Sequence, residues 1–168
     1  SGVSDSFTYT STVVSNSIEL TIPQTDIAQW VDGDTYLISA TVSDVGGNLS
    51  NQAMSTFVVD KTSPSGLISS DVERLQSGAT AQITFSLSEL SNDFDPTSSS
   101  IISVSYGSLI NGSVSGTTYT AQYTQPGTEQ NNVVFTLIAN SFRDLAGNSN
   151  TASATLVLAL NSAPEGTP

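Results

Sequence analysis

Apolar residues occupy every second position in several short stretches of the chain, which is typical of β-strands with one buried face. The clearest stretch has Ala81, Ile83, Phe85 and Leu87 alternating with polar residues. The same alternation predicts further strands near residues 18–22, 36–42, 119–123 and 156–160. Long stretches of the strongest helix-forming residues are missing. The pattern therefore predicts an all-β fold.

Turn motifs separate these predicted strands at short intervals. They are Asp32-Gly33-Asp34, Gly46-Gly47-Asn48, Ser77-Gly78, Asn111-Gly112, Ser115-Gly116 and Pro126-Gly127. Glycine and asparagine supply the backbone conformations that tight turns require. Many short antiparallel strands joined in this way predict a β-sandwich or a barrel.

Composition excludes several classes of function. The chain of 168 residues has no His and no Cys, so it can hold neither a Ser-His-Asp triad nor a His/Cys metal site. Its net charge of −12 opposes binding to nucleic acid or to an anionic membrane surface. Nothing places two carboxylates in a cleft with aromatic walls, as a glycosidase would need. We therefore expect a protein that is not an enzyme.

An internal repeat of 100 residues indicates two domains. The motif Asp44-Val45-Gly46-Gly47-Asn48 returns as Asp144-Leu145-Ala146-Gly147-Asn148, and Pro64 returns as Pro164. This length suits one immunoglobulin-like sandwich. The repeat predicts an incomplete first domain at 1–62, whose opening strands are missing, and a complete second domain at 63–161. Residues 162–168 would form a linker to a further repeat.

The order of these motifs resembles the bacterial immunoglobulin-like (Big-type) domains of giant repetitive surface adhesins. The resemblance rests on Asp-x-Ala-Gly-Asn before a final strand and on Val59-Asp60-Lys61-Thr62-Ser63-Pro64 at the junction. It implies tandem immunoglobulin-like β-sandwiches in a protein similar to the long calcium-dependent adhesins that Gram-negative bacteria export by type I secretion. It implies an extracellular, cell-surface location.

Fifteen acidic residues against three basic ones indicate that most carboxylates are solvated or bind cations. Calcium prefers six to eight oxygen ligands, and the chain has no EF-hand loop, so separate loops must supply them. Tracing the sandwich brings acids from both domains and the linker to the junction. The predicted Ca²⁺ ligands are Asp32, Asp34, Asp60, Glu89, Asp93 and Asp144.

Simpler interpretations stay open for several of these residues. Asp44 and Asp144 can cap tight turns through their side chains, with the Gly-Asn pair supplying positive φ angles. Glu89 can be an ordinary solvated carboxylate, and Asp32 and Asp34 can be turn formers. Trp30 fits a core or junction position better than a sugar-stacking one.

Three functions remain compatible with the sequence. The first is an extender module that projects a distal adhesive domain for cell adhesion or biofilm formation, with calcium stiffening the junction. Its partners would be neighbouring repeats of the same chain and, through the distal domain, a host-cell or abiotic surface, without membrane insertion. The second is a module that itself binds a carbohydrate or a surface. The third is an accessory sandwich of a secreted enzyme.

Overall fold

The computed structural model describes residues 6–13, 17–126 and 132–161. The chain divides into two compact units, residues 1–60 and 61–168. The division falls two residues before the boundary that the repeat predicts. The predicted turn residue Gly127 and the predicted linker 162–168 lie outside the described residues.

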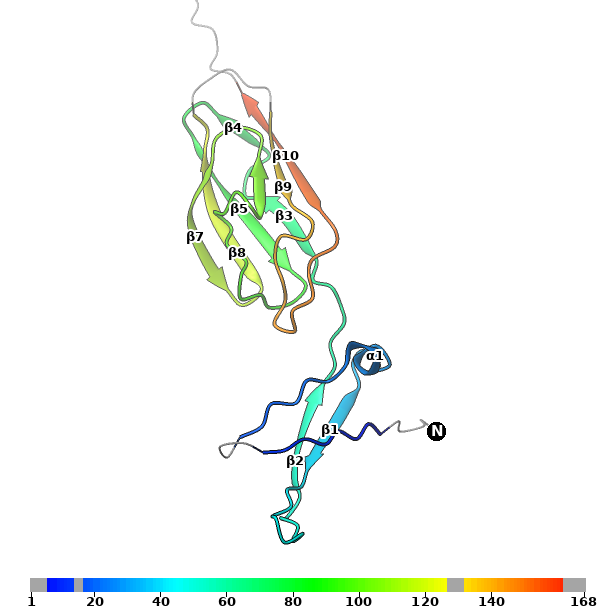
Figure 1. Cartoon of the computed structure of the whole chain (residues 1–168). Coiled ribbons are helices and arrows are strands. Elements are labelled where there is room, and N and C mark those ends of the chain that lie inside the picture. The colour runs from blue at the N-terminus through cyan, green and yellow to red at the C-terminus, as the bar shows by residue number, and fades with distance from the viewer. Residues whose placement is uncertain (1–5, 14–16, 127–131, 162–168) are drawn as a thin grey trace, which may run out of the picture. The chain divides into compact units, whose positions relative to one another are not determined.

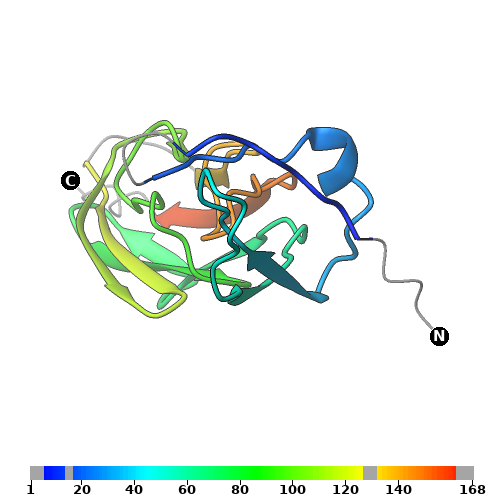
Figure 2. The ribbon, with the colours of Figure 1, turned by 60° about the horizontal axis from the view of Figure 1, so that its bottom comes forward.

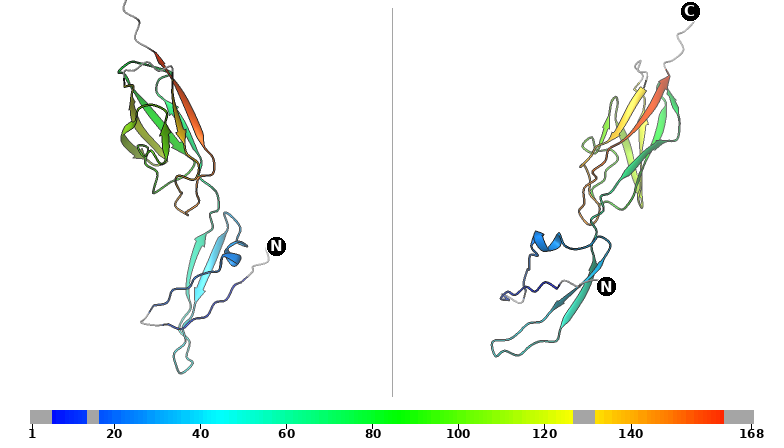
Figure 3. Two further views of the ribbon diagram at one scale, coloured as in Figure 1. Left: turned by 45° about the horizontal axis from the view of Figure 1, so that its top comes forward. Right: turned by 90° about the vertical axis from the view of Figure 1, so that its right-hand side faces the viewer.

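The second unit is a sandwich of two four-stranded sheets, which Figures 1 and 3 show as facing layers. One sheet has the order β3–β5–β8–β7, and the other has the order β4–β10–β9–β6. The short β4 pairs in parallel with β10, whereas the other pairs of strands are antiparallel. Together with the first unit, described below, these sheets confirm the predicted all-β class. The strands are β3 (Gly66–Ser70), β4 (Arg74–Gln76), β5 (Thr80–Leu87), β6 (Ile102–Val104), β7 (Leu109–Ser115), β8 (Thr118–Thr124), β9 (Asn132–Leu137) and β10 (Ala154–Asn161).

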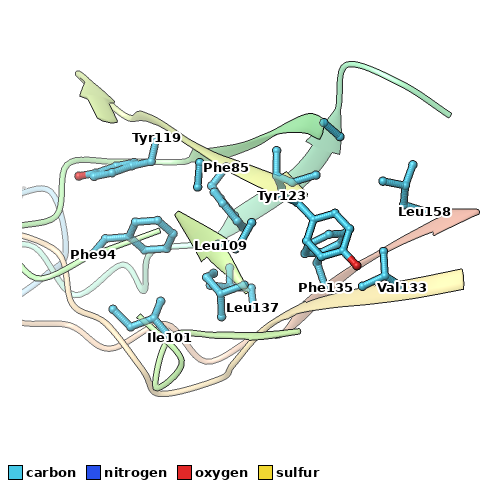
Figure 4. Close-up of a cluster of buried hydrophobic side chains, with 14 of the residues drawn as sticks. Phe85, Phe94, Ile101, Leu109, Tyr119, Tyr123, Val133, Phe135, Leu137 and Leu158 are labelled. Carbon is cyan, nitrogen blue, oxygen red and sulfur yellow. The ribbon is translucent and has the colours of Figure 1, made fainter. Parts of the chain in front are cut away.

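The core of this unit lies between the two sheets and follows the predicted alternation. Along β5 every apolar residue of the alternating set is buried, and the polar residues between them face outward. Facing strands complete the core with Tyr123 and Phe135, which lie next to each other in Figure 4. The two rings meet edge to face, with their centroids 5.1 Å apart. Each such ring removes well over 100 Å² of apolar surface from water, which is the main favourable term in folding.

Gly66 lets β3 pass close to this core. A Cβ atom built on Gly66 would lie 2.7 Å from a methyl group of Leu137 and 3.0 Å from one of Leu87. Both neighbours are buried, so neither can move away without a cost in packing. Glycine at this position therefore reflects steric need rather than a turn.

The Asn111-Gly112 pair forms a bulge within β7, not a turn between strands as the sequence predicts. The register with β8 shifts between Ile110 and Ser113, and Asn111 adopts a φ of 54°. Its side-chain amide donates to the side-chain carbonyl oxygen of Gln122 on β8 at 2.7 Å. Because β7 is an edge strand, the bulge interrupts a backbone that could pair with another chain.

The first unit contains a two-stranded antiparallel sheet, β1 (Thr35–Ala40) and β2 (Ala53–Val58), and a one-turn helix, α1 (Gln24–Ile27). The helix appears as the short coiled ribbon in Figure 2. Trp30 packs against the rings of Tyr36 and Phe57 at 5.3 and 5.1 Å, which agrees with its predicted packing role. No helix in the described part of the chain is long and apolar enough to cross a membrane.

The strand predicted at 18–22 does not form in the first unit. Residues 18–23 belong to no strand, and Figure 3 draws them as irregular ribbon. Leu20 keeps half of its surface exposed, which leaves the predicted apolar face partly in water. The preceding segment contacts α1 through the Tyr9 hydroxyl, which donates to the Asp26 carboxylate. That hydrogen bond is the main reason why the pKa of Tyr9 rises to about 12.

The Tyr123 hydroxyl is buried and has no hydrogen-bond partner among the residues that the structure describes. Burial raises the pKa of Tyr123 because it removes the hydroxyl from solvent. We predict that Tyr123→Phe leaves the free energy of unfolding unchanged or raises it by about 1 kcal/mol, because it removes an unsatisfied polar group. Chemical denaturation of the full chain measures this change.

Tyr119 provides the matched control, since its hydroxyl donates to the Ser91 carbonyl at 3.0 Å. Tyr119→Phe should lower the free energy of unfolding by about 1 kcal/mol. Equal losses in the two variants would contradict the assignment of Tyr123 as unsatisfied.

Candidate metal site and the loops that carry it

The Asp144–Asn148 loop, which leads toward β10, is built around the Asp144 carboxylate. One carboxylate oxygen accepts from the backbone N–H groups of Gly147 and Asn148 at 2.7 and 2.9 Å. The other accepts from the Asn148 side-chain amide at 2.9 Å. Gly147 has a φ of 96°, which a residue with a side chain rarely adopts. The sequence motif therefore encodes a turn held by its first and last residues.

The first repeat of the motif forms the same structure. One Asp44 carboxylate oxygen accepts from the backbone N–H groups of Gly46 and Asn48, and the other accepts from the Asn48 side chain at 2.8 Å. The backbone of Asp44 also closes the loop by donating to the Asn48 carbonyl. The turn-capping interpretation thus holds for both aspartates.

These hydrogen bonds favour the charged form of both carboxyl groups. For Asp44, the bond from the Asn48 side chain is the largest cause of a pKa below the ordinary value. For Asp144, burial alone would raise the pKa. The combined bonds from Asn148, Gly147 and Ala146 outweigh burial, and the pKa of Asp144 is lowered.

The buried Asp144 carboxylate lies close to two other acidic side chains. Asp60, Glu89 and Asp144 each place a carboxylate oxygen within 4.8 Å of the other two. Asp60 is exposed and directly precedes the second unit in the chain, and Glu89 follows β5 and is half-buried. Oxygens bound to one Ca²⁺ at 2.3–2.6 Å lie at most about 5 Å apart. The chemistry and spacing of the three groups therefore fit a calcium ion.

Aromatic packing in the core fixes the loops that carry these acids. Phe94 follows Glu89 in the connection between β5 and β6, and Phe142 precedes Asp144. Their rings meet edge to face at 5.0 Å, and Phe94 also packs against Tyr119 at 4.6 Å. Figure 4 shows Phe94 pointing into the same buried cluster as Tyr119. Core packing thus holds the two loops side by side.

The other predicted ligands lie outside this group of three. Asp93 accepts the backbone N–H of Arg143 at 2.8 Å and the Ser91 hydroxyl at 2.9 Å, so it ties the two loops together. Asp32 and Asp34 belong to the first unit, where they flank Gly33 in a turn. Gly33 has a φ of 79° and donates to the Val59 carbonyl, as a turn-forming role requires.

Asn150 is a key residue of the loop that sequence reasoning missed. It is fully buried, and its side-chain carbonyl accepts from the backbone N–H groups of Ser141 and Phe142 at 2.8 and 3.0 Å. Its side-chain amide donates to the Ile138 and Ala152 carbonyls. The sequence indicates this role only through the repeat, in which Ser50 occupies the position that corresponds to Asn150. The Ser50 hydroxyl likewise accepts from a backbone N–H group, that of Val42.

The family model of the bacterial Ig-like domain matches residues 60–160. The match covers more than half of the chain, so the chain belongs to the family of bacterial Ig-like domains. Domains of this family are typically non-catalytic structural modules of extracellular or surface proteins. No curated protein and no solved structure matches the chain.

We predict that Asn150→Ala lowers the free energy of unfolding of the second unit by about 3 kcal/mol, because it removes the buried acceptor of the Ser141 and Phe142 backbone N–H groups. Thr151→Ala is the control, since Thr151 is the exposed neighbour in the chain. Thermal and denaturant unfolding measure both variants. A loss in Asn150→Ala no larger than that of the control would contradict the structural role of Asn150.

The Asp44 loop predicts a pH dependence. Because its folded-state pKa lies below the unfolded value, the carboxylate stabilises the loop above about pH 4, and this contribution disappears as the pH falls through the lowered pKa. Asn48→Ala should move the pKa of Asp44 upward, as measured by NMR titration of the carboxyl carbon. Asn51→Ala should leave the Asp44 titration unchanged; an unchanged titration in Asn48→Ala would refute the assigned cause.

Proposed function

We propose that the chain is an extender module of a large secreted bacterial adhesin, in which Ca²⁺ stiffens the segment that enters the second domain. The observation that carries this proposal is the group of Asp60, Glu89 and Asp144 within 4.8 Å of one another. Membership in the bacterial Ig-like family supports a surface or extracellular module. The module would project a distal adhesive domain for cell adhesion or biofilm formation.

The three carboxylates have a physical reason to take up a cation. Two unit charges 4 Å apart repel each other by about 1 kcal/mol in water and about 4 kcal/mol near a protein surface. A divalent ion would convert this repulsion into attraction. Asp60 and Glu89 would supply ligands from the entering segment and from the end of β5, and Asp144 would supply a third from a loop that its own hydrogen bonds already hold.

The distribution of charge supports a spacer over an enzyme. Arg74 is the only charged residue in the strands that the structure describes. The described acids of the second unit lie in the connections between strands, and Asp60 directly precedes that unit. Such an arrangement puts cation-binding groups at the ends of a neutral body, where successive modules of one chain would adjoin.

The surface gives less support to the alternative of a carbohydrate-binding module. The hollow beside β7, of about 250 Å³, is lined by Phe94, Asp95, Pro96, Thr97, Gly112, Ser113, Val114 and Tyr119. Both aromatic residues in this lining are buried in the core, with exposures of 7% and 4%. They offer no open ring on which a sugar could stack.

The remaining assignments follow from the same proposal. The protein would lie outside the cell on the bacterial surface, with type I secretion as its route. Its immediate partners would be neighbouring repeats of the same polypeptide, and a host-cell or abiotic surface would be reached through the distal domain. An accessory sandwich of a secreted enzyme is the other role that the family would permit.

Calcium titration with thermal melts tests the metal site. We predict that Ca²⁺ at a hundredfold excess over its dissociation constant raises the free energy of unfolding by about 2.7 kcal/mol, because the ion binds only the folded form. Mg²⁺ should give a smaller effect, since it requires a tighter octahedron. Small-angle scattering in calcium and in chelator would report the stiffening as an increase in the maximum dimension.

Two substitutions that each remove one negative charge distinguish loss of the metal site from a general effect of charge on calcium binding. Asp60→Asn should abolish most of the calcium response, because it removes one of the three carboxylates. Glu73→Gln, between β3 and β4, should respond as the wild type does. If calcium changes neither the melting temperature nor the scattering, the site does not exist. If Asp60→Asn responds as the wild type does, the ion binds elsewhere.

A further inference from the structure

The bulge in β7 carries the only Asn-Gly pair of the sequence, Asn111-Gly112. Both residues are exposed, and β7 is the last strand of its sheet. The register of β7 with β8 passes from Ile110 to Ser113, so the pair is left out of the paired positions. Solvent therefore reaches both residues of the pair.

The fold favours these two residue types at the bulge. Asn111 has a φ of 54°, in the left-handed region that asparagine adopts more readily than most residues. A Cβ atom built on Gly112 would lie 3.1 Å from the ring of the buried Pro96 and 3.1 Å from the methyl group of Thr97. A side chain at position 112 would therefore crowd the connection between β5 and β6. The bulge thus places an exposed asparagine before a residue without a side chain.

Asparagine is a thermolabile residue, and an exposed asparagine before glycine has a direct route to deamidation in water. A base removes the proton of the Gly112 N–H group, and the nitrogen attacks the side-chain carbonyl carbon of Asn111. The new C–N bond closes a succinimide ring, while the side-chain nitrogen takes up a proton and leaves as ammonia. Water then opens the ring at either carbonyl and gives aspartate or isoaspartate. Glycine favours the attack because no side chain blocks the nitrogen and the backbone rotates freely.

We propose that Asn111-Gly112 is a site of spontaneous deamidation and that Gln122 restrains its rate in the folded chain. The Asn111 side-chain amide donates to the side-chain carbonyl oxygen of Gln122 at 2.7 Å. This bond directs the side chain toward β8, whereas the attack requires its carbonyl carbon to lie over the Gly112 nitrogen. The reaction therefore follows the breaking of this bond, which local opening of an edge strand permits. The site is independent of the proposed calcium function.

The other asparagines of the sequence lack this combination of features. Each of them precedes a residue with a side chain, as Asn48 precedes Leu49 and Asn148 precedes Ser149. In both of these loops, the carboxylate of the first aspartate also holds the asparagine amide. Asn150 is fully buried. Asn111 should therefore react faster than the other asparagines.

Deamidation would change the edge of the sheet. A carboxylate at position 111 cannot donate to Gln122, so the hydrogen bond between β7 and β8 is lost. Isoaspartate would also lengthen the backbone within the bulge by one carbon atom. Either product adds a negative charge to β7, and charge on an edge strand opposes pairing with another chain.

Incubation of the full chain at mildly alkaline pH, followed by peptide mass spectrometry, tests the proposal. Peptides that contain Asn111 should gain the mass difference between a hydroxyl and an amino group faster than peptides with any other asparagine. Isoaspartate among the products shows that the succinimide formed, because direct hydrolysis of the amide gives only aspartate. Deamidation at Asn111 that is no faster than elsewhere, or that gives no isoaspartate, would overturn the proposal.

Two substitutions of Gln122 and a matched control measure its restraint on the reaction. Gln122→Ala removes the acceptor and should speed deamidation about fivefold, the factor expected for the loss of one hydrogen bond. Gln122→Glu keeps a side-chain oxygen that accepts from Asn111, so its rate should not exceed that of the wild type. Gln82→Ala removes the same side chain from the facing position on β5 and should leave the rate unchanged. Equal rates in Gln122→Ala and Gln82→Ala would overturn the role of Gln122.

Discussion

The edge-to-face contact between Phe94 and Phe142 determines where the acidic loops of the second domain lie. Both rings belong to connections rather than strands, yet both are buried, so each connection is fixed to the core beside its carboxylate. Asp93 adds a polar link by accepting from the backbone of Arg143. Because interior packing allows little movement, the spacing of Glu89 and Asp144 is set before any ion binds. Packing in the core therefore positions Glu89 and Asp144, two of the three acids of the candidate metal site.

The sequence predicts this fold well where a strand has one buried face. The alternation along β5, β8 and β10 is present in the structure because the two sheets bury one set of side chains each. The prediction of a strand fails at residues 18–22, although apolar residues alternate just as clearly there. Alternation reports which residues would be buried once a sheet exists, and it carries no information about whether a neighbouring strand is present to build that sheet.

The site was predictable only in part, for a related reason. The Asp-x-x-Gly-Asn motif encodes its own turn through local hydrogen bonds, so its conformation could be inferred from five residues. The contribution of Asn150 depends on backbone groups near Ser141, which come close only after the loop has folded. Likewise Asn111-Gly112 has the residues of a turn, but pairing of β7 with β8 on both sides makes it a bulge. Conformations that depend on local hydrogen bonds could be predicted from the sequence, whereas those that depend on distant residues could not.

The two copies of the loop separate the structural role of its aspartate from any metal-binding role. Asp44 and Asp144 receive closely similar hydrogen bonds, yet within the described residues only Asp144 stands in a group of three acids. Within the described residues, the Asp44 copy adopts the loop without such a group, so the hydrogen bonds of the motif itself account for its shape. What distinguishes the second copy is the presence of Asp60 and Glu89, which the loop does not require for folding. Selection for cation binding would act on these two residues, and selection for the turn would act on Asp144 and Asn148.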